Sequence, residues 1–113
     1  MATATFVQDG NSVDYTPGAD VAAGAVVVQG DLIGIARTPI ASGVLGSLAV
    51  AGVFDLPKAT GGGSGIAAGT SVYWDVADQQ AKADSESGAN KLLGKVVKAA
   101  ADADTTVRVR LSQ

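Results

Sequence analysis

Cysteine and histidine are both absent from the 113 residues of this sequence. Without cysteine the chain has no disulfide bond and no thiolate nucleophile, which fits a cytoplasmic product. Without histidine it lacks the commonest general base, the usual catalytic triads and most zinc sites. No pair of carboxylates lies in an apolar setting that would separate two pKa values for acid–base catalysis. We therefore expect a protein that is not an enzyme and that holds no cofactor.

Aromatic and charged residues are also scarce. Only 4% of residues are aromatic, and many of the 47% that are hydrophobic are alanine, so the core should be shallow. Association of subunits would add stability to such a chain. Charged residues make up 17% and the net charge is −3, which argues against a nucleic-acid-binding protein because that class needs a basic surface. The length fits one domain, residues 1–113.

Long apolar runs are missing too. Residues 22–28 are too few and too interrupted by glycine to span a membrane, so we expect no membrane association. No basic segment followed by an apolar run opens the sequence, so we also expect no signal peptide.

The basic residues that are present cluster in the C-terminal part. Six of the eight lie from residue 82 onward: Lys82, Lys91, Lys95, Lys98, Arg108 and Arg110. Two interpretations are open. These side chains either belong to solvated faces of strands, or form a patch complementary to an acidic protein partner.

Short β-strands separated by turn residues account for most of the chain. Residues 69–75 hold the only tryptophan, and Val72, Tyr73 and Trp74 in this segment strongly favour a strand. Val72 and Trp74 should point to one side and Tyr73 to the other, so this segment should dominate the packing. Further strands are expected at residues 3–7, 12–16, 25–29, 32–38, 47–50, 53–56, 80–83, 92–98 and 105–111.

The connections between these strands carry turn signals. Asp9-Gly10-Asn11 predicts a hairpin that pairs residues 3–7 with residues 12–16. Residues 60–65 are rich in glycine and predict a flexible exposed loop. Residues 99–103 form either one helical turn or an extended connection. The whole pattern predicts an all-β, single-domain barrel or sandwich of short antiparallel strands.

A weak internal repeat runs through the chain. Residues 21–24 followed by 26–28 resemble residues 66–69 followed by 71–73, and residues 32–37 resemble residues 92–97. The second pair of segments has glycine at the same position, Gly34 and Gly94. The repeat indicates two related β units, unless it is a chance match in a chain rich in alanine, valine and glycine.

Two kinds of segment resemble ligand sites. Residues 61–65 and 88–96 are rich in glycine, but the first lacks the lysine of a phosphate-binding loop, and Val96 occupies the place of the hydroxyl that would bind Mg²⁺. The aspartate pairs in 75–78 and 102–104 supply too few oxygen ligands for a calcium loop, so we expect them to cap turns.

Three aromatic residues are candidates for an interface. Phe54 and Trp74 either pack in the core or contact a partner. Phe6, with its neighbour Val7, belongs to a short terminal strand that is either held in the fold or free to add to the sheet edge of another subunit. We therefore treat residues 1–8 as a possible contact arm.

The order of the segments resembles that of the capsid cement or decoration proteins of tailed phages, some members of which carry a recombinase label. The resemblance covers nearly the whole chain. The segments that carry it are residues 6–10, 27–36, 52–58, 69–75, 93–96 and 105–111. Its most specific pieces are Phe-Asp-Leu-Pro-Lys at 54–58, Val-Tyr-Trp-Asp at 72–75 and Val-Arg-Val-Arg-Leu at 107–111.

This resemblance implies a virion protein on the outer surface of an icosahedral head that bridges subunits of the major capsid protein. It also implies homo-oligomers, with trimers favoured over dimers. The recombinase label has no support, because the chain has no intact phosphate-binding motif and no basic DNA surface. Arg108 and Arg110 are then candidates for charged contacts. The alternatives are a structural subunit of the phage neck or tail and a small carbohydrate- or ligand-binding β module.

Overall fold

The computed structural model describes residues 4–5 and 10–112, and these residues form β-strands without any helix. The described part of the chain therefore contains no helix that could cross a membrane. The strands are β1 (Ser12–Tyr15), β2 (Val26–Gln29), β3 (Leu32–Ile35), β4 (Gly46–Ala49), β5 (Val53–Pro57), β6 (Ser71–Asp75), β7 (Gln80–Lys82), β8 (Lys91–Lys98) and β9 (Thr106–Leu111).

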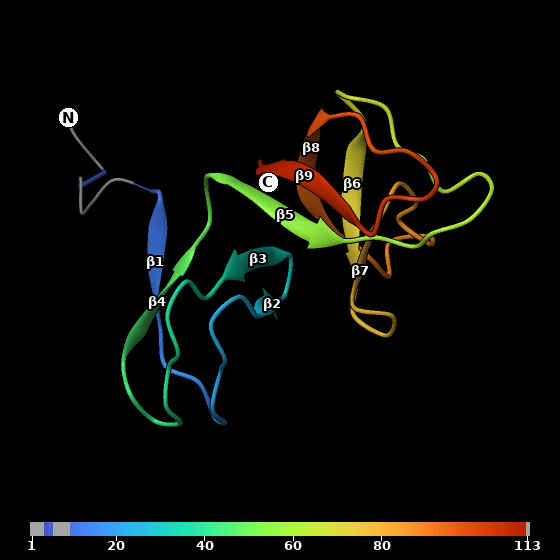
Figure 1. Ribbon diagram of the computed structural model, residues 1–113. Helices are drawn as coiled ribbons and strands as arrows, with labels where there is room; N and C mark the ends of the chain where they lie inside the picture. Colours follow the sequence, from blue (N-terminus) through green and yellow to red (C-terminus); the bar gives the residue numbers. More distant parts are fainter. Residues whose placement is uncertain (1–3, 6–9, 113) are drawn as a thin grey trace.

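The strands form two antiparallel sheets (Figure 1). The N-terminal unit, residues 12–49, is a four-stranded sheet in the order β1-β4-β3-β2. The C-terminal unit, residues 53–111, is a five-stranded sheet in the order β5-β9-β8-β6-β7. The predicted all-β class and the predicted division into two β units are both confirmed.

Most strands lie where the sequence predicts them, but one of them is shorter than expected. The strand expected at 32–38 ends at Ile35, before a bend at residues 37–38. Of the two alternatives for residues 99–103, the extended connection is observed at Ala100, which pairs with Ile66 in an antiparallel bridge. The expected strand at 3–7 falls mostly outside the described residues, and β1 pairs with β4.

Strand β6 contributes strongly to the main core, as its sequence predicts. Val72 and Trp74 are 0% and 3% exposed, and Tyr73 on the opposite side is half-buried. Ile33 and Ile35 of β3 belong to the same core cluster, so one face of the N-terminal unit packs against the C-terminal unit. A second, smaller cluster around Leu48 lies on the other face of the N-terminal sheet.

The internal repeat is present in the backbone hydrogen bonds. Gly24 N donates to Ala36 O at 2.6 Å, and Gly69 N donates to Val96 O at 2.7 Å. Both glycines lie in a turn and have the positive φ that glycine adopts readily, +86° and +87°. The antiparallel bridges between Val21 and Ile40 and between Ile66 and Ala100 are also equivalent.

The sheets repeat the same topology. The order β1-β4-β3-β2 matches β5-β9-β8-β6, and β7 is an additional edge strand of the C-terminal unit. Val27 pairs with Gly34 as Val72 pairs with Gly94. The small core of the N-terminal unit has a counterpart in the main core. Equivalent residues are Val13 and Phe54, Tyr15 and Leu56, Val21 and Ile66, Val27 and Val72, Ala36 and Val96, Ile40 and Ala100, and Leu48 and Val109.

Candidate interaction surface

Basic side chains gather on the outer face of the five-stranded sheet. Along β9 the valines and the final leucine point into the core, and Arg108 and Arg110 point outward, as the alternation predicts. Lys95 and Lys98 of the neighbouring strand β8 are also exposed. We call the surface formed by Lys95, Lys98, Arg108 and Arg110 the cationic face.

The strand register places like charges opposite each other on this face. Lys95 lies directly across from Arg110, and Lys98 lies across from Arg108. Directly opposed like charges destabilise an antiparallel pair by a few tenths to about 1 kcal/mol. Asp55 of β5 lies across from Arg108 on its other side and offsets one of these charges.

The ion pair between Arg108 and Asp55 is bidentate but open to solvent. Arg108 Nε and Nη2 donate to the two carboxylate oxygens of Asp55 at 3.0 and 3.3 Å. This hydrogen bonding lowers the pKa of Asp55 and raises the pKa of Arg108. Both side chains are about half exposed, at 50% and 48%, so the pair contributes little to stability.

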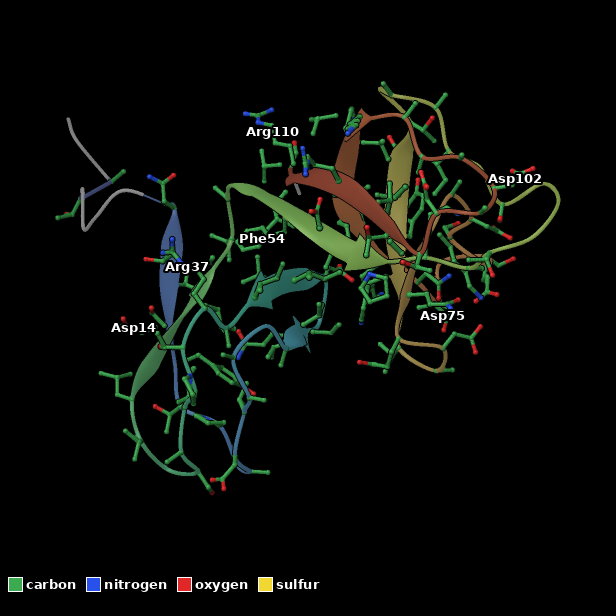
Figure 2. All side chains as sticks on the ribbon, in the orientation of Figure 1. Asp14, Arg37, Phe54, Asp75, Asp102 and Arg110 are labelled. Carbon is green, nitrogen blue, oxygen red and sulfur yellow. The ribbon has the colours of Figure 1, made fainter. Side chains whose placement is uncertain are left out.

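Arg110 differs from Arg108 in having no ion pair with a carboxylate in the part of the chain that the structure describes. Its cross-strand neighbours are Val53, which is 54% exposed, and Lys95. Lys95 Nζ donates to Ser71 Oγ at 3.2 Å, whereas Arg110 has no hydrogen-bond or ion-pair partner among the described residues. Figure 2 shows Arg110 extending away from the body of the sheet.

A polar pocket of about 280 Å³ lies at one end of the cationic face. Asp55, Lys98 and Arg108 line it together with residues 104–107, where the connection from β8 enters β9. The pocket is large enough for one side chain of a partner and has a basic residue on two of its strands.

The aromatic candidates lie in other places. Phe6 and Val7 fall outside the described residues. Phe54 is half-buried and packs against the main core, on the side of β5 opposite Asp55. Trp74 is only 3% exposed, which favours core packing over contact with a partner. The structure therefore brings Arg108 and Arg110 together on the outer face of the sheet and places Phe54 and Trp74 on its core side.

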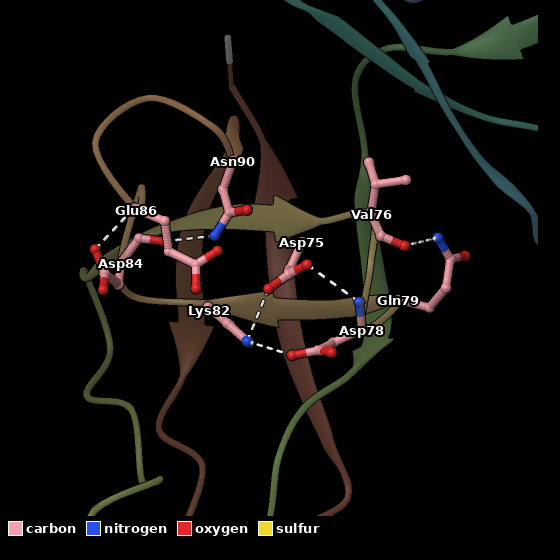
Figure 3. Close-up of polar contacts among 8 residues, drawn as sticks. All are labelled: Asp75, Val76, Asp78, Gln79, Lys82, Asp84, Glu86 and Asn90. Carbon is pink, nitrogen blue, oxygen red and sulfur yellow. Dashed lines mark hydrogen bonds and ion pairs between the residues drawn. The ribbon is translucent and has the colours of Figure 1, made fainter.

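The aspartates of residues 75–78 cap a turn and hold a lysine, as Figure 3 shows. Asp75 Oδ1 accepts from Asp78 N at 3.1 Å, and Lys82 Nζ lies 2.8 Å from Asp75 and 2.6 Å from Asp78. The hydrogen bond from Lys82 lowers the pKa of Asp75, and the hydrogen bond to Asp75 raises the pKa of Lys82. In the described ranges, no three or more Asp or Glu side chains gather in a group that could hold a metal ion.

The glycine-rich loop is bonded to the connection between β8 and β9. Gly65 N donates to Asp102 Oδ1 at 2.6 Å, and Ser64 Oγ donates to Asp102 O at 2.9 Å. Asp104 Oδ2 accepts from Ala101 N at 2.8 Å. Asp104 caps its turn as predicted. Asp102 instead bonds across to the glycine-rich loop and points a carboxylate at it, which is unfavourable for a phosphate.

Comparison with known proteins identifies the family. A family model described as phage cement protein matches residues 7–111. The chain belongs to the phage cement protein family. A search of curated proteins and a search of solved structures gave no significant match.

Membership gives this cement protein a structural, capsid-binding role in a phage, and a location in the virion with the capsid. A structural role fits a chain without cysteine or histidine. It also fits an outward surface that offers charge and a shallow polar pocket.

The sequence indicated part of this surface. The alternation in residues 105–111 predicted that Arg108 and Arg110 face outward together. The contribution of Lys95 was not predictable in the same way, because Gly94 and two register irregularities in β8 interrupt its alternation. The excess of basic residues after residue 82 was the one signal that pointed to it.

Proposed function

We propose that this cement protein binds the outer surface of the assembled phage head and joins neighbouring subunits of the major capsid protein. The observation that carries the proposal is the family match over residues 7–111, which covers nearly the whole chain. We further propose that the chain acts as one domain and assembles into homotrimers.

The physical requirements of a cement protein are modest. A protein that binds only the assembled shell stabilises it by mass action, since its binding free energy is gained only in that state. A trimer presents several docking surfaces at once, so weak individual contacts combine through their effective concentration. Neither requirement calls for a catalytic group, which agrees with the composition of this chain.

Co-sedimentation with heads tests the proposal. Purified expanded heads that lack this protein would be mixed with it, pelleted and assayed for bound protein, with isolated coat subunits as the control. We expect saturable binding to heads, no binding to isolated subunits and a trimeric mass by light scattering. Rings or tubes formed by the protein alone would favour a neck or tail subunit instead. A monomer that does not bind heads would favour the small carbohydrate- or ligand-binding module.

We also propose that residues 1–8 act as a contact arm through Phe6 and Val7. Deleting residues 1–8 should leave the unfolding transition in place and lower occupancy on heads. A second test variant carries Phe6→Ser and Val7→Ser, which keeps the length of the segment and should also lower occupancy. Unchanged occupancy of both variants would contradict the contact arm but would leave the capsid-binding role intact.

A further inference from the structure

The repeat makes it possible to compare the same sheet face in two environments. In the N-terminal unit Ile35 pairs with Ala49, and in the C-terminal unit Lys95 pairs with Arg110 at the equivalent position. Ile35 and Ala49 are 3% and 2% exposed, and Ile35 belongs to the core cluster shared with the C-terminal unit. The face that is covered in the first unit is therefore open in the second.

The charges on the open face are not required by the fold. The N-terminal unit builds the same strand order with Ile35, Ala49 and Ser47 in the positions of Lys95, Arg110 and Arg108. Opposing Lys95 to Arg110 costs stability, and among the described residues only Ser71 Oγ accepts a hydrogen bond from either of these two side chains. Such charges are expected where an outside group of opposite sign completes the pairing.

We infer that the cationic face is a docking surface for an acidic protein surface on the assembled head. This inference rests on the proposed function and names the chemistry of the partner. The partner would supply carboxylates to Arg110 and Lys95 and would cover the exposed Val53 and Val97 that accompany them. One partner side chain would enter the pocket beside Lys98.

The remainder of the molecule favours an acidic protein over a nucleic acid as partner. The chain carries a net charge of −3, so its long-range field repels a polyanion. A local face of opposite sign to the rest of the surface instead favours one docking orientation on a partner with a defined acidic patch.

The test compares variants of equal net charge in the same head-binding assay. The first variant carries Lys95→Gln and Arg110→Gln. The matched control carries Arg37→Gln and Lys91→Gln, which removes the same number of charges away from the paired positions of the face. Binding to heads would be measured by co-sedimentation across a series of salt concentrations, and thermal unfolding of each variant would be recorded.

We expect the Lys95 and Arg110 variant to bind heads about tenfold more weakly at low salt and to lose much of its salt dependence. Its melting temperature should equal or exceed that of the wild type, because a like-charge pair is removed. The affinity of the control variant for heads should stay within about twofold of the wild-type affinity, which is the effect expected for exposed charges.

Three results would overturn the inference in distinguishable ways. Equal binding of both variants, with wild-type salt dependence, would exclude the cationic face and leave the capsid-binding role standing. Failure of the wild type to bind heads would remove the proposed function and this inference with it. Binding of the wild type to duplex DNA, lost in the Lys95 and Arg110 variant, would assign the face to nucleic acid.

Discussion

Lys58 is the clearest case in which a single side chain holds separate segments together. It is 4% exposed, and its Nζ donates to the backbone oxygens of Ala59, Ala101 and Asp104 at 2.7, 3.0 and 2.9 Å. A buried ammonium is tolerated when its donors are satisfied, and here all three have acceptors. The lysine that closes the Phe-Asp-Leu-Pro-Lys segment thus joins the end of β5 to the connection between β8 and β9.

Replacing Lys58 with methionine should keep most of its volume and remove these hydrogen bonds. We expect Lys58→Met to lower the free energy of unfolding by about 2–3 kcal/mol, since three backbone carbonyls lose a charged donor. Urea unfolding would measure the change. Lys98→Met is the control, because Lys98 is exposed, and an equal urea midpoint for both variants would contradict this role of Lys58.

Asp75 should contribute to the pH dependence of stability. Its pKa is lowered from 3.8, mainly by the hydrogen bond from Lys82. A carboxyl with a lower pKa in the folded chain stabilises the fold above 3.8 and loses that contribution as the pH falls through the folded value. The Asp75→Asn variant should therefore lose less stability than the wild type when the pH falls below 3.8. Urea midpoints measured across that pH range would show the difference.

The control for this experiment is Asp14→Asn, because Asp14 is exposed on β1 and has no lysine beside it in the described residues. If the urea midpoint of the Asp75→Asn variant depended on pH as it does in the wild type, the contact with Lys82 would not determine this pH dependence.

At the scale of strands, local sequence predicted where elements lie but not how they pair. Alternation in residues 105–111 and the aromatic segment at 71–75 are local signals, and both strands appear where expected. The pairing of β1 with β4 joins segments that are far apart in the chain, and a local turn signal at Asp9-Gly10-Asn11 gave no information about it. Lys58 was likewise unpredictable, because its acceptors come from a distant connection.

Glycine at position 94 should be essential to the pairing of β8 with β9. A Cβ atom there would lie 1.9 Å from the carbonyl oxygen of Arg110, and one at Gly34 would lie 2.6 Å from Leu48 Cβ. We expect Gly94→Ala to destabilise the fold by about 3 kcal/mol or more, because the backbone of β9 at Arg110 would have to move. Gly34→Ala should cost less, since the side chain of Leu48 can shift with its strand.

Gly62→Ala is the matched control for both substitutions, because a Cβ there meets no atom within 4 Å. Its free energy of unfolding should change by less than about 1 kcal/mol. Equal urea midpoints for the Gly94 and Gly62 variants would show that the strands separate easily at this point.

The whole molecule is held together by a core that crosses from one unit to the other. Ile33 and Ile35 of the N-terminal unit belong to the same cluster as Trp74, Val72 and Leu93 of the C-terminal unit. The repeat was visible in the sequence as short similar segments. Its three-dimensional consequence, one face covered and its equivalent open, depended on packing that no local pattern encodes.

Unfolding of the two units should therefore be coupled. Ile35→Ala in the N-terminal unit should lower the stability of the C-terminal unit by about 2–4 kcal/mol, because a buried side chain of the shared core is truncated. The fluorescence of Trp74, in the C-terminal unit, would report the change during urea unfolding. Leu45→Ala, at a side chain that is 66% exposed, should leave the midpoint in place. An unmoved midpoint for Ile35→Ala would indicate units that unfold independently.

The two equivalent faces also differ in when each one meets water. Ile35 and Ala49 are covered as the chain folds, so an apolar surface there is never presented to other molecules. Lys95 and Arg110 remain exposed to solvent in the free protein, and their charges keep this surface from being an apolar patch that would aggregate. The same position in the repeat thus carries apolar side chains where burial accompanies folding, and charged side chains where the proposed burial comes only with assembly.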